Sequence, residues 1–569
     1  MKNAADTFST KLHRWIPGLR LLREYQLAWL PKDLAAGMTL GTIMIPAGLA
    51  FGELAGVPLA GLYAGMLPLV FYALFGSSKQ LIIGPDASMA ALVALNLAPL
   101  ANGDAVRLTV LAGLLALLIG VICIAASLMR LGFVADFLAK PVIVGFMHGM
   151  AVVIAVGLLP KVLGVSGSGE TTAALFLSVC GNLSSIHWVS FAIGASSVAI
   201  ILACRRWWPK IPGQIVALVL GILAVRVFNL EALGVKVVGI IPQGLPSVHA
   251  PLFTLADFNA LLPLALAAAV VAISDSVATA RGFASRNRYR VDANQEMLAL
   301  GLGNIASSLT QGLPVSGSGS RTAAAESAGS RTQLTSLVAA SIVACVMLFL
   351  TSLFYSLPSA ALGGILIAAA WSLCDFPEFK RMWRFSGAGL VGALLTMAGV
   401  VGGGVIEGIG IGVLYSLVLL MKALAFPDDA VLGETATGEF RDVTRAPDAR
   451  SVSGVLVYRF SAPLFFANCG QFRNRIESLL ETASEPVRAV VIDASPIIRV
   501  DLAGCELLSE MHAQLRSRGV RLIIADLRSA VHEAVVKGWE GAATEESLFF
   551  ANVAAAVQGV QSNPVAAKK

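Results

Sequence analysis

The feature that most constrains this chain is a succession of long apolar segments between residues 34 and 425. An apolar run of about 20 residues is long enough to cross the hydrocarbon core of a bilayer as a helix. The chain is 56% hydrophobic and 13% charged, with a mean hydropathy of +0.78, whereas soluble proteins average about 25% charged residues. The sequence therefore predicts a polytopic α-helical membrane protein.

The apolar segments predict fourteen spans, several of them short. They read as 34–56, 58–75, 86–101, 107–128, 138–162, 188–204, 214–229, 260–281, 292–310, 318–329, 333–354, 359–374, 386–401 and 405–425. The spans that begin near 86 and 318 are too short to cross as plain helices. Residues 1–33 are polar and basic, which predicts a cytoplasmic N-terminal tail and no signal peptide.

The distribution of basic residues predicts the orientation. If the N-terminus is inside, twenty Lys and Arg residues up to residue 384 fall in inner segments, and four fall in outer loops, at positions 107, 161, 226 and 236. Positive charge gathers on the cytoplasmic side of membrane proteins. We therefore expect both termini in the cytoplasm and the protein in the cell inner (plasma) membrane. This asymmetry also accounts for the net charge of +6, so the charge does not indicate nucleic-acid binding.

Residues 311–330, QGLPVSGSGSRTAAAESAGS, bring an arginine, four glycines and several hydroxyls into this apolar series. They predict a short extended piece near Pro314 and then a helix capped by Ser318 or Ser320. A helix that begins at membrane depth points unpaired N–H groups into the interior, and Arg321 adds a full positive charge. A helix end of this kind can bind an anion. The alternative interpretation of residues 311–330 is a solvent-exposed loop between two soluble helices.

A second segment, residues 80–98, QLIIGPDASMAALVALNLA, has the same construction of an extended run, a turn and a small-residue helix. The two segments form the third and tenth of fourteen spans, so the halves of the chain face opposite ways across the membrane. Inverted repeats with paired interrupted helices are typical of secondary transporters, with substrate bound between the half-helix N-termini. We therefore predict a 7+7 inverted repeat with interrupted helices 3 and 10.

Three charged residues are candidates for the chemistry of this site. Asp275 lies within the eighth span, where a carboxylate is costly and usually functional, and Thr279 shares its helix face. Asp275 is either a buried partner of Arg321 or a proton or cation site. Asp86 begins the other half-helix, as a plain N-cap or as part of the site. With all three ionised, the protein would supply one excess negative charge, which favours symport with a cation over a bare anion channel.

Several other polar residues have simpler interpretations. Glu53 and Glu296 fall near span ends, so we expect them to be solvated. His148 lies within an apolar span and is expected to be a satisfied core histidine. The seven scattered cysteines predict free or packing thiols, and no Walker motif supports ATP-driven transport.

The sequence changes character near residue 451. Strands at 454–460, 489–495 and 521–526 alternate with helices near 471–481, after Asp501 and after Arg528. This order predicts a small layered α/β domain at 451–557, preceded by a charged linker at 426–450 and followed by a disordered tail at 558–569. It has no nucleophile–base pair or metal cluster, so we expect a docking module and no enzyme.

Three stretches carry a specific family resemblance: QLIIGPDASMAAL, the run from SDSVATARGF to QGLPVSGSGSRTA, and AGSRTQL. From about residue 15 to 555 the chain resembles the sulfate permease (SulP) family of anion transporters, called solute carrier family 26 in animals. The C-terminal domain resembles the family's STAS domain. The resemblance implies that a core domain of spans 1–4 and 8–11 moves against a gate domain of spans 5–7 and 12–14. It also implies a homodimer.

The resemblance also places an anion site. The implied substrate-binding residues are Ala47, Phe51, Asp86, Ala87, Ser88, Gly319, Ser320 and Arg321. Asp275 stands where many members have a glutamate tied to proton coupling and some have a cation-binding aspartate, so Na⁺ at Asp275 is the metal ion to consider. The family's first span often reads Ile-Pro-Gln, but Ala47 replaces that glutamine, which leaves room for a larger anion. In the C-terminal domain, the turn at 500–504 carries no hydroxyl, which argues against a phosphorylation switch there.

Together these observations predict a secondary active anion transporter that takes up sulfate with H⁺ or Na⁺ and needs no other cofactor. Bicarbonate and C4-dicarboxylates are alternative substrates. An uncoupled exchanger or channel, or an anion sensor acting through the STAS domain, is an alternative class. The expected partners are a small anion, membrane lipid, a second copy of the chain and a cytoplasmic protein at the STAS domain.

Overall fold

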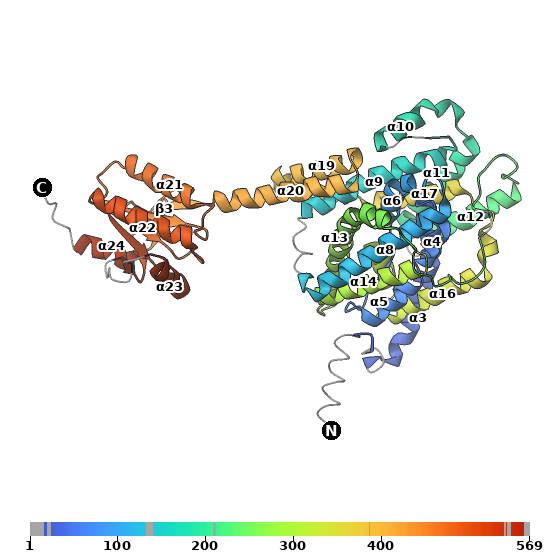
Figure 1. Cartoon of the computed structure of the whole chain (residues 1–569), viewed down its shortest axis with the longest axis horizontal. Coiled ribbons are helices and arrows are strands. Elements are labelled where there is room, and N and C mark those ends of the chain that lie inside the picture. Colours follow the sequence, from blue (N-terminus) through green and yellow to red (C-terminus); the bar gives the residue numbers. More distant parts are fainter. Residues whose placement is uncertain are drawn as a thin grey trace, which may run out of the picture. The chain divides into compact units, whose positions relative to one another are not determined.

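The structure is a computed structural model, and it describes residues 16–19, 24–132, 140–167, 169, 171–208, 212–239, 241–385, 387–539, 542 and 548–562. The chain divides into two compact units, Met1–Ser416 and Leu417–Lys569. The first unit is helical apart from two short strands in its described part, and the second is α/β (Figure 1). Most of the predicted N-terminal tail lies outside the described residues.

Each predicted span coincides with a helix or a broken helix of the first unit. The spans are, in order, α3 (Leu30–Leu54), α4 (Pro58–Tyr63) with α5 (Leu67–Phe75), α6 (Ala87–Asn96) with α7 (Ala98–Ala101), α8 (Ala105–Leu128), α9 (Lys140–Leu163), α11 (Trp188–Trp207), α12 (Gly213–Val227), α13 (Leu255–Arg286), α14 (Ala293–Leu309), α15 (Gly319–Ser327), α16 (Leu334–Phe349), α17 (Ser359–Leu373), α19 (Gly387–Gly402) and α20 (Val405–Ala425). The structure adds α10 (Thr172–Gly181) and α18 (Phe376–Phe385), which sequence analysis did not separate from their surroundings.

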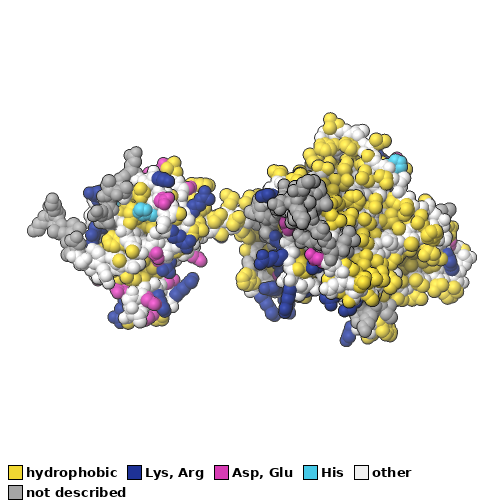
Figure 2. All heavy atoms as spheres, turned by 90° about the horizontal axis from the view of Figure 1, so that it is seen from below, with side chains coloured by type: hydrophobic (Ala, Val, Ile, Leu, Met, Phe, Trp, Pro, Cys, Tyr) yellow, Lys and Arg dark blue, Asp and Glu magenta, His cyan; other side chains and the backbone are white. Residues whose placement is uncertain are grey.

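Length and composition agree with a membrane location. Among the described residues, 8 helices are long and apolar enough to cross a membrane, and five further apolar helices have 10–17 residues. The interrupted third span belongs to this shorter group, because α6 has only 10 residues. In Figure 2, hydrophobic side chains cover much of the visible face of the helical unit, and its Lys and Arg side chains gather mainly at one margin.

The spans pack into two groups. In one group α3 packs against α16, and α8 packs against α14 and α13; in the other, α9 packs against α17, α19 and α11. Helix α3 also touches α12 and α17, and α6 touches α9, so these helices line the boundary between the groups. This is the predicted arrangement of core and gate within an inverted repeat, and the fold class is confirmed.

The second unit is a six-stranded sheet with helices on both faces. Its elements are β3 (Asp429–Glu434), β4 (Phe440–Asp442), β5 (Val455–Phe460), α21 (Cys469–Glu481), β6 (Ala489–Asp493), α22 (Leu502–Ser517), β7 (Arg521–Ala525), α23 (Ser529–Gly538), β8 (Phe549–Phe550) and α24 (Val553–Ser562). The strand order is β4-β3-β5-β6-β7-β8, with β5 to β8 parallel and β3 antiparallel to its two neighbours. Alternation along β5 sends Leu456, Tyr458 and Phe460 to the core shared with α21–α23, and Val455 and Val457 to the side of α24.

Two predicted boundaries of this unit differ from the structure. The segment 426–450, expected to be a linker, forms β3 and β4, because Leu432 is buried against the sheet core and β3 pairs with β5. Helix α24 runs to Ser562, into the segment expected to be disordered, and residues 563–569 lie outside the described part. The predicted cap of α22 is confirmed, since Asp501 Oδ1 accepts a hydrogen bond from Gly504 N at 2.9 Å.

All seven cysteines of the chain are free, in line with the prediction that they are not paired. In the second unit, burial raises the pKa of the Cys469 thiol to about 11. A thiol with so high a pKa is mostly protonated near neutral pH and is therefore a weak nucleophile.

Candidate functional site

Two short antiparallel strands bring the interrupted segments together at the centre of the helical unit. Strand β1 (Ile83–Pro85) pairs with β2 (Val315–Gly317), with Gly84 opposite Ser316. Helix α6 begins directly after β1, and α15 begins directly after β2. The pairing therefore holds two helix N-termini close together, as predicted from the repeated segments, and their partial positive charges add.

The N-terminus of α6 is partly neutralised by its own chain. Asp86 is its N-cap, and its Oδ2 accepts hydrogen bonds from Ser88 N at 3.1 Å and Ser88 Oγ at 2.5 Å. The side chains of Asp86 and Ser88 are therefore both engaged in capping α6. The remaining unpaired first-turn N–H groups of α6 are those of Ala87 and Met89.

The N-terminus of α15 carries a neutral cap. Ser318 is the N-cap, as predicted, and its Oγ accepts from Arg321 N at 3.4 Å. Thr322 N bonds to the carbonyl of Ser318 at 2.9 Å, which leaves the N–H groups of Gly319 and Ser320 for a ligand. A Cβ at Gly319 would lie 3.9 Å from Thr279 Oγ1 of α13, so Thr279 faces this helix end.

Arg321 is buried, with 5% of its surface exposed. Its Nη1 lies 3.5 Å from Met44 Sδ of α3 and 3.3 Å from a Cβ built on Gly84. Its Nε and Nη2 find no hydrogen-bond partner among the described residues. An electrostatic interaction connects it with Asp86. A buried guanidinium with two unused donors is costly unless an anion shares its surroundings.

Asp275 lies at the boundary between the two groups of helices. It borders a small cavity of about 10 Å³ that Ser274 also lines, together with Ile143, Phe146 and Met147 of α9 and Ile409 of α20. Asp275, like Arg321, interacts electrostatically with Asp86. The contacts thus connect both residues to Asp86, and they give no support to Asp275 as the direct partner of Arg321.

Ala47 and Phe51 lie four residues apart on α3, which packs against both α6 and α15. Phe51 is 8% exposed, and Ala47 is partly buried against the main core. Since residues four apart share a helix face, Ala47 lies on the same face of α3 as Phe51. A longer side chain at position 47, such as glutamine, would lie on that face too.

Sequence analysis missed the side chains that hold the two strands. Ser276 Oγ accepts from Gly317 N at 2.8 Å, and Thr322 Oγ1 accepts from Ile82 N at 3.0 Å. Asn304 binds both the N–H and the carbonyl of Val315, each at 2.9 Å. Ser276 and Asn304 carry no charge and lie within apolar helices, while Thr322 lies in the segment 311–330 but carries no charge that would have drawn attention to it.

Two glutamates expected to be solvated are engaged. Glu296 is 1% exposed and accepts from Tyr72 Oη, from the N–H groups of Ser77 and Ser78, and from Ser77 Oγ. It thereby fixes the segment that leads into β1. Glu53 of α3 accepts from Lys161 Nζ of α9 at 3.0 Å, and Lys161 also donates to the Glu53 carbonyl at 2.8 Å. This ion pair joins the core group to the gate group.

His148 of α9 is buried, as predicted, but only one of its two ring nitrogens has a hydrogen-bond partner among the described residues. Its Nδ1 lies 2.8 Å from the carbonyl of Val144, and its ring packs against Phe376 and Phe379 of α18. Its Nε2 has no hydrogen-bond partner among the described residues.

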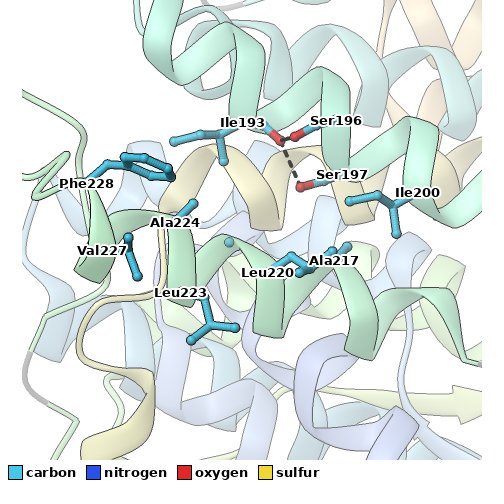
Figure 3. A pocket seen from close by; sticks show the side chains of 11 residues that line it. Ile193, Ser196, Ser197, Ile200, Ala217, Leu220, Leu223, Ala224, Val227 and Phe228 are labelled. Atoms are coloured by element: carbon cyan, nitrogen blue, oxygen red, sulfur yellow. Dashed lines mark hydrogen bonds between the residues drawn. The ribbon is translucent and has the colours of Figure 1, made fainter.

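A large pocket lies away from the half-helices, between α11 and α12 (Figure 3). It has a volume of about 370 Å³ and an apolar lining that includes Ile193, Leu220 and Leu223. Its two hydroxyl groups, those of Ser196 and Ser197, donate to the carbonyl of Ile193. Both hydroxyl groups already donate to the helix backbone, so this pocket has no free hydrogen-bond donor for an inorganic anion among its lining side chains. The half-helix site therefore remains the candidate anion site.

Paired half-helices inside an inverted repeat, with a buried arginine at their junction, define a membrane transporter. The sequence model of the Sulfate permease family matches residues 30–396, and that of the STAS domain matches residues 446–556. The chain belongs to the sulfate permease family, a family of anion transporters, and carries its C-terminal STAS domain.

Relatives and solved structures agree with this assignment. A "Probable sulfate transporter" of Mycobacterium tuberculosis is 40% identical over 523 residues, covering 92% of this chain and 93% of the relative. The structure of the murine Solute Carrier 26 family member A9 anion transporter in the inward-facing state has a TM-score of 0.89 at 24% identity and covers 98% of this chain and 95% of that one. The transmembrane domain of a cyanobacterium bicarbonate transporter has a TM-score of 0.60 at 26% identity and covers 69% and 98%.

Proposed function

We propose that this protein is a secondary active transporter that takes up sulfate together with H⁺ or Na⁺. The observation that carries the proposal is the buried Arg321 beside two facing half-helix N-termini. Each helix end contributes about half a positive charge, and the N–H groups of Gly319 and Ser320 can bind oxyanion oxygens directly. Arg321 supplies long-range attraction at the junction, since its guanidinium packs against Gly84 and Met44.

Charge balance is the argument for coupling. The positive helix ends and Arg321 together offset the carboxylates of Asp86 and Asp275 if both are ionised. A divalent anion would then leave the site strongly negative, which is costly at low dielectric. Protonation of Asp275, or Na⁺ bound beside it with help from Thr279, reduces that cost. Asp275 borders both core and gate helices, so its charge can also bias their relative movement.

Alternating access requires a site that opens to one side at a time. On α15, exposed positions recur at Ser320, Ala323 and Ser327, which share one face of the helix. We infer that the end rich in basic residues is cytoplasmic, that both termini lie there, and that the protein resides in the inner (plasma) membrane.

The direct test is uptake of labelled sulfate by proteoliposomes. We expect Arg321→Ala to abolish saturable uptake and to weaken sulfate binding by at least tenfold, because a buried charge opposite an anion contributes several kcal/mol. Arg331→Ala is the matched control, since that arginine is exposed in the segment after α15. Equal sulfate affinity in the two variants would remove Arg321 from the site.

Coupling is tested separately from binding. With Asp275→Asn, we expect sulfate exchange to persist while accumulation driven by a proton or sodium gradient is lost. Gradient-driven accumulation that survives in this variant would exclude Asp275 as the coupling residue. If uptake by the unaltered protein depends on neither the proton nor the sodium gradient, the protein is an uncoupled exchanger or a channel.

Bicarbonate is the second candidate substrate, favoured by the likeness to the bicarbonate transporter domain. C4-dicarboxylates are a third, because Ala47 leaves space where a longer side chain would stand. A counterflow panel of sulfate, bicarbonate, fumarate, succinate and chloride, with and without Na⁺ at two pH values, ranks them. Sulfate that fails to exchange while another anion does would overturn the substrate assignment.

We also propose that the chain works as a homodimer and that its STAS domain docks a cytoplasmic partner or regulates flux. A truncation must begin before Asp429, because β3, the first strand of the sheet, begins at that residue. Deleting residues 427–569 removes the whole six-stranded sheet and its helices, and keeps α20 intact. Normal flux after this deletion would separate transport from any sensing role, and light scattering of the purified protein gives its oligomeric state.

A further inference from the structure

Helix α18 is short, amphipathic and placed between two spans, α17 and α19. Its sequence, FPEFKRMWRF, holds four aromatic and three basic residues in 10 positions. Met382 is buried at 8% exposure, while Trp383 is 70% exposed and Phe385 is 91% exposed. A helix of this length cannot cross a bilayer on its own, and α18 follows directly on the C-terminal end of α17.

The exposed face of α18 is basic. Lys380 and Arg384 are four residues apart, and Arg381 is three residues before Arg384, so the three share one side of the helix. All three are exposed, and the side chain of Arg381 is 77% accessible. We call Lys380, Arg381 and Arg384 the basic stripe.

Glu378, the acidic residue of α18, already forms ion pairs. Glu378 Oε1 accepts from Lys140 Nζ of α9 at 2.7 Å, and its other oxygen lies 3.8 Å from Arg381 Nη1. Lys380 and Arg384 form no ion pair within the described residues. The stripe therefore presents net positive charge outward, with little internal neutralisation.

Aromatic side chains border the stripe. Trp383 lies three residues after Lys380. The ring of Phe376 lies against the exposed Trp371 of α17, with centroids 5.4 Å apart and planes tilted by 48°. Exposed Trp and Phe beside Lys and Arg are typical of helices that lie in the plane of a membrane interface. The aromatic rings then enter the acyl boundary while the cations meet the headgroups.

We propose that α18 is an interfacial helix whose basic stripe binds the headgroup of an anionic phospholipid in the adjacent leaflet. Charge complementarity selects the lipid class, because a zwitterionic headgroup offers no net charge to three cations. Trp383 anchors the helix at the depth where this contact forms.

Such a lipid would brace the gate group. Helix α18 packs on α9 and α19, and Phe376 and Phe379 contact the ring of His148 on α9. The same stretch of α9 supplies Ile143, Phe146 and Met147 to the cavity beside Asp275. The lipid contact is thus one helix away from the candidate coupling residue.

The test is lipid affinity of the full chain, measured by native mass spectrometry with phosphatidylglycerol and phosphatidylcholine titrated separately. We expect tighter binding of phosphatidylglycerol, weakened on the order of fivefold for each charge removed from the stripe. The variant K380Q/R381Q/R384Q should therefore lose roughly a hundredfold, and Trp383→Ala should weaken both lipids. The K380R/R381K/R384K variant, which keeps all charges, should bind as the unaltered protein does.

The matched control is R518Q/R528Q, which removes two exposed arginines from the α/β unit. The proposal is overturned if the triple Gln variant keeps its phosphatidylglycerol affinity, or if this control loses as much per charge. It is also overturned if a photo-cross-linker at position 380 captures the α/β unit instead of lipid. Because the readout is lipid binding, the result does not depend on which anion the protein carries.

Discussion

The ion pair between Glu53 and Lys161 predicts a measurable bias in how the core and gate groups are arranged. Glu53 lies in the last turn of α3, and Lys161 lies in the last turn of α9. Movement of core against gate that opens this end must separate the two residues. We therefore expect Lys161→Met to favour the conformation in which this end is open.

The structure sets the size of the effect. Lys161 Nζ lies 3.0 Å from the carboxylate and 2.8 Å from the carbonyl of Glu53, and the two side chains are 33% and 19% exposed. Exposed ion pairs contribute about 0.2–1 kcal/mol, and hydrogen bonds to charged groups contribute about 1.5–3 kcal/mol. Partial exposure places this contact between these limits, at about 1–2 kcal/mol, which corresponds to a roughly 5–30-fold change in the ratio of the two conformations.

Spin labels can report that ratio directly. Val106 at the start of α8 and Ser166 after α9 are both exposed and belong to opposite groups of helices. Pulsed electron resonance on labels at these positions, with the exposed Cys180 and Cys345 replaced by Ser, measures the distance between core and gate. We expect Lys161→Met to increase the long-distance population, and Glu53→Gln to do so less, since the carbonyl contact survives.

A double-mutant cycle separates this pair from general destabilisation. The double variant should resemble Lys161→Met alone, and added salt should weaken the effect because part of the pair is exposed. Additive effects of the two single changes, or a distance distribution that ignores both, would refute the idea that this contact biases the conformation.

Three further predictions concern contacts within one or the other of the two units. Gly84→Ala places a Cβ 2.9 Å from Met44 Cε and 3.3 Å from Arg321 Nη1. Overpacking of about 1–3 kcal/mol should therefore weaken sulfate binding on the order of tenfold, and calorimetry showing unchanged affinity would contradict this. Glu296→Ala leaves four donors without their acceptor, so thermal unfolding should show a loss of about 3–5 kcal/mol, and a melting temperature equal to that of the unaltered protein would argue against it. Asp493→Ala removes the ion pair between Asp493 Oδ2 and Arg459 Nε, which are 2.6 Å apart. It should destabilise the α/β unit by about 2–3 kcal/mol, with no change expected in anion affinity.

Much of the fold could be predicted because its signals are local. Each span is an apolar run of its own, and the caps Asp86, Ser318 and Asp501 stand directly before the helices they cap. The repeat was visible because both halves place an extended run before a small-residue helix. The exceptions arise where a signal is weak: β3 and β4 are short strands in a charged segment, and their pairing with β5 is what makes them strands.

The residues that hold the site could not be predicted in the same way. Glu296 and Tyr72 are 224 positions apart, and Glu53 and Lys161 are 108 positions apart. Because Glu296 and Glu53 lie near span ends, the sequence predicted that both carboxylates are solvated. Only the three-dimensional fold brings a hydrogen-bond donor to each of them. Local pattern specifies which segments cross the membrane, whereas partners distant in sequence decide which of their charges are buried.

The two half-helices are alike in backbone but unlike in charge, and this difference bears on where an anion binds. The carboxylate of Asp86 caps α6 and holds Ser88, so an anion at that end meets a negative charge within one turn. The hydroxyl of Ser318 caps α15, and Arg321 follows three residues later. We therefore expect an anion to bind nearer to Gly319 and Ser320 than to the end of α6. Asp86→Asn should then tighten anion binding while Ser318→Asp weakens it, although the two substitutions stand at equivalent positions of an inverted repeat.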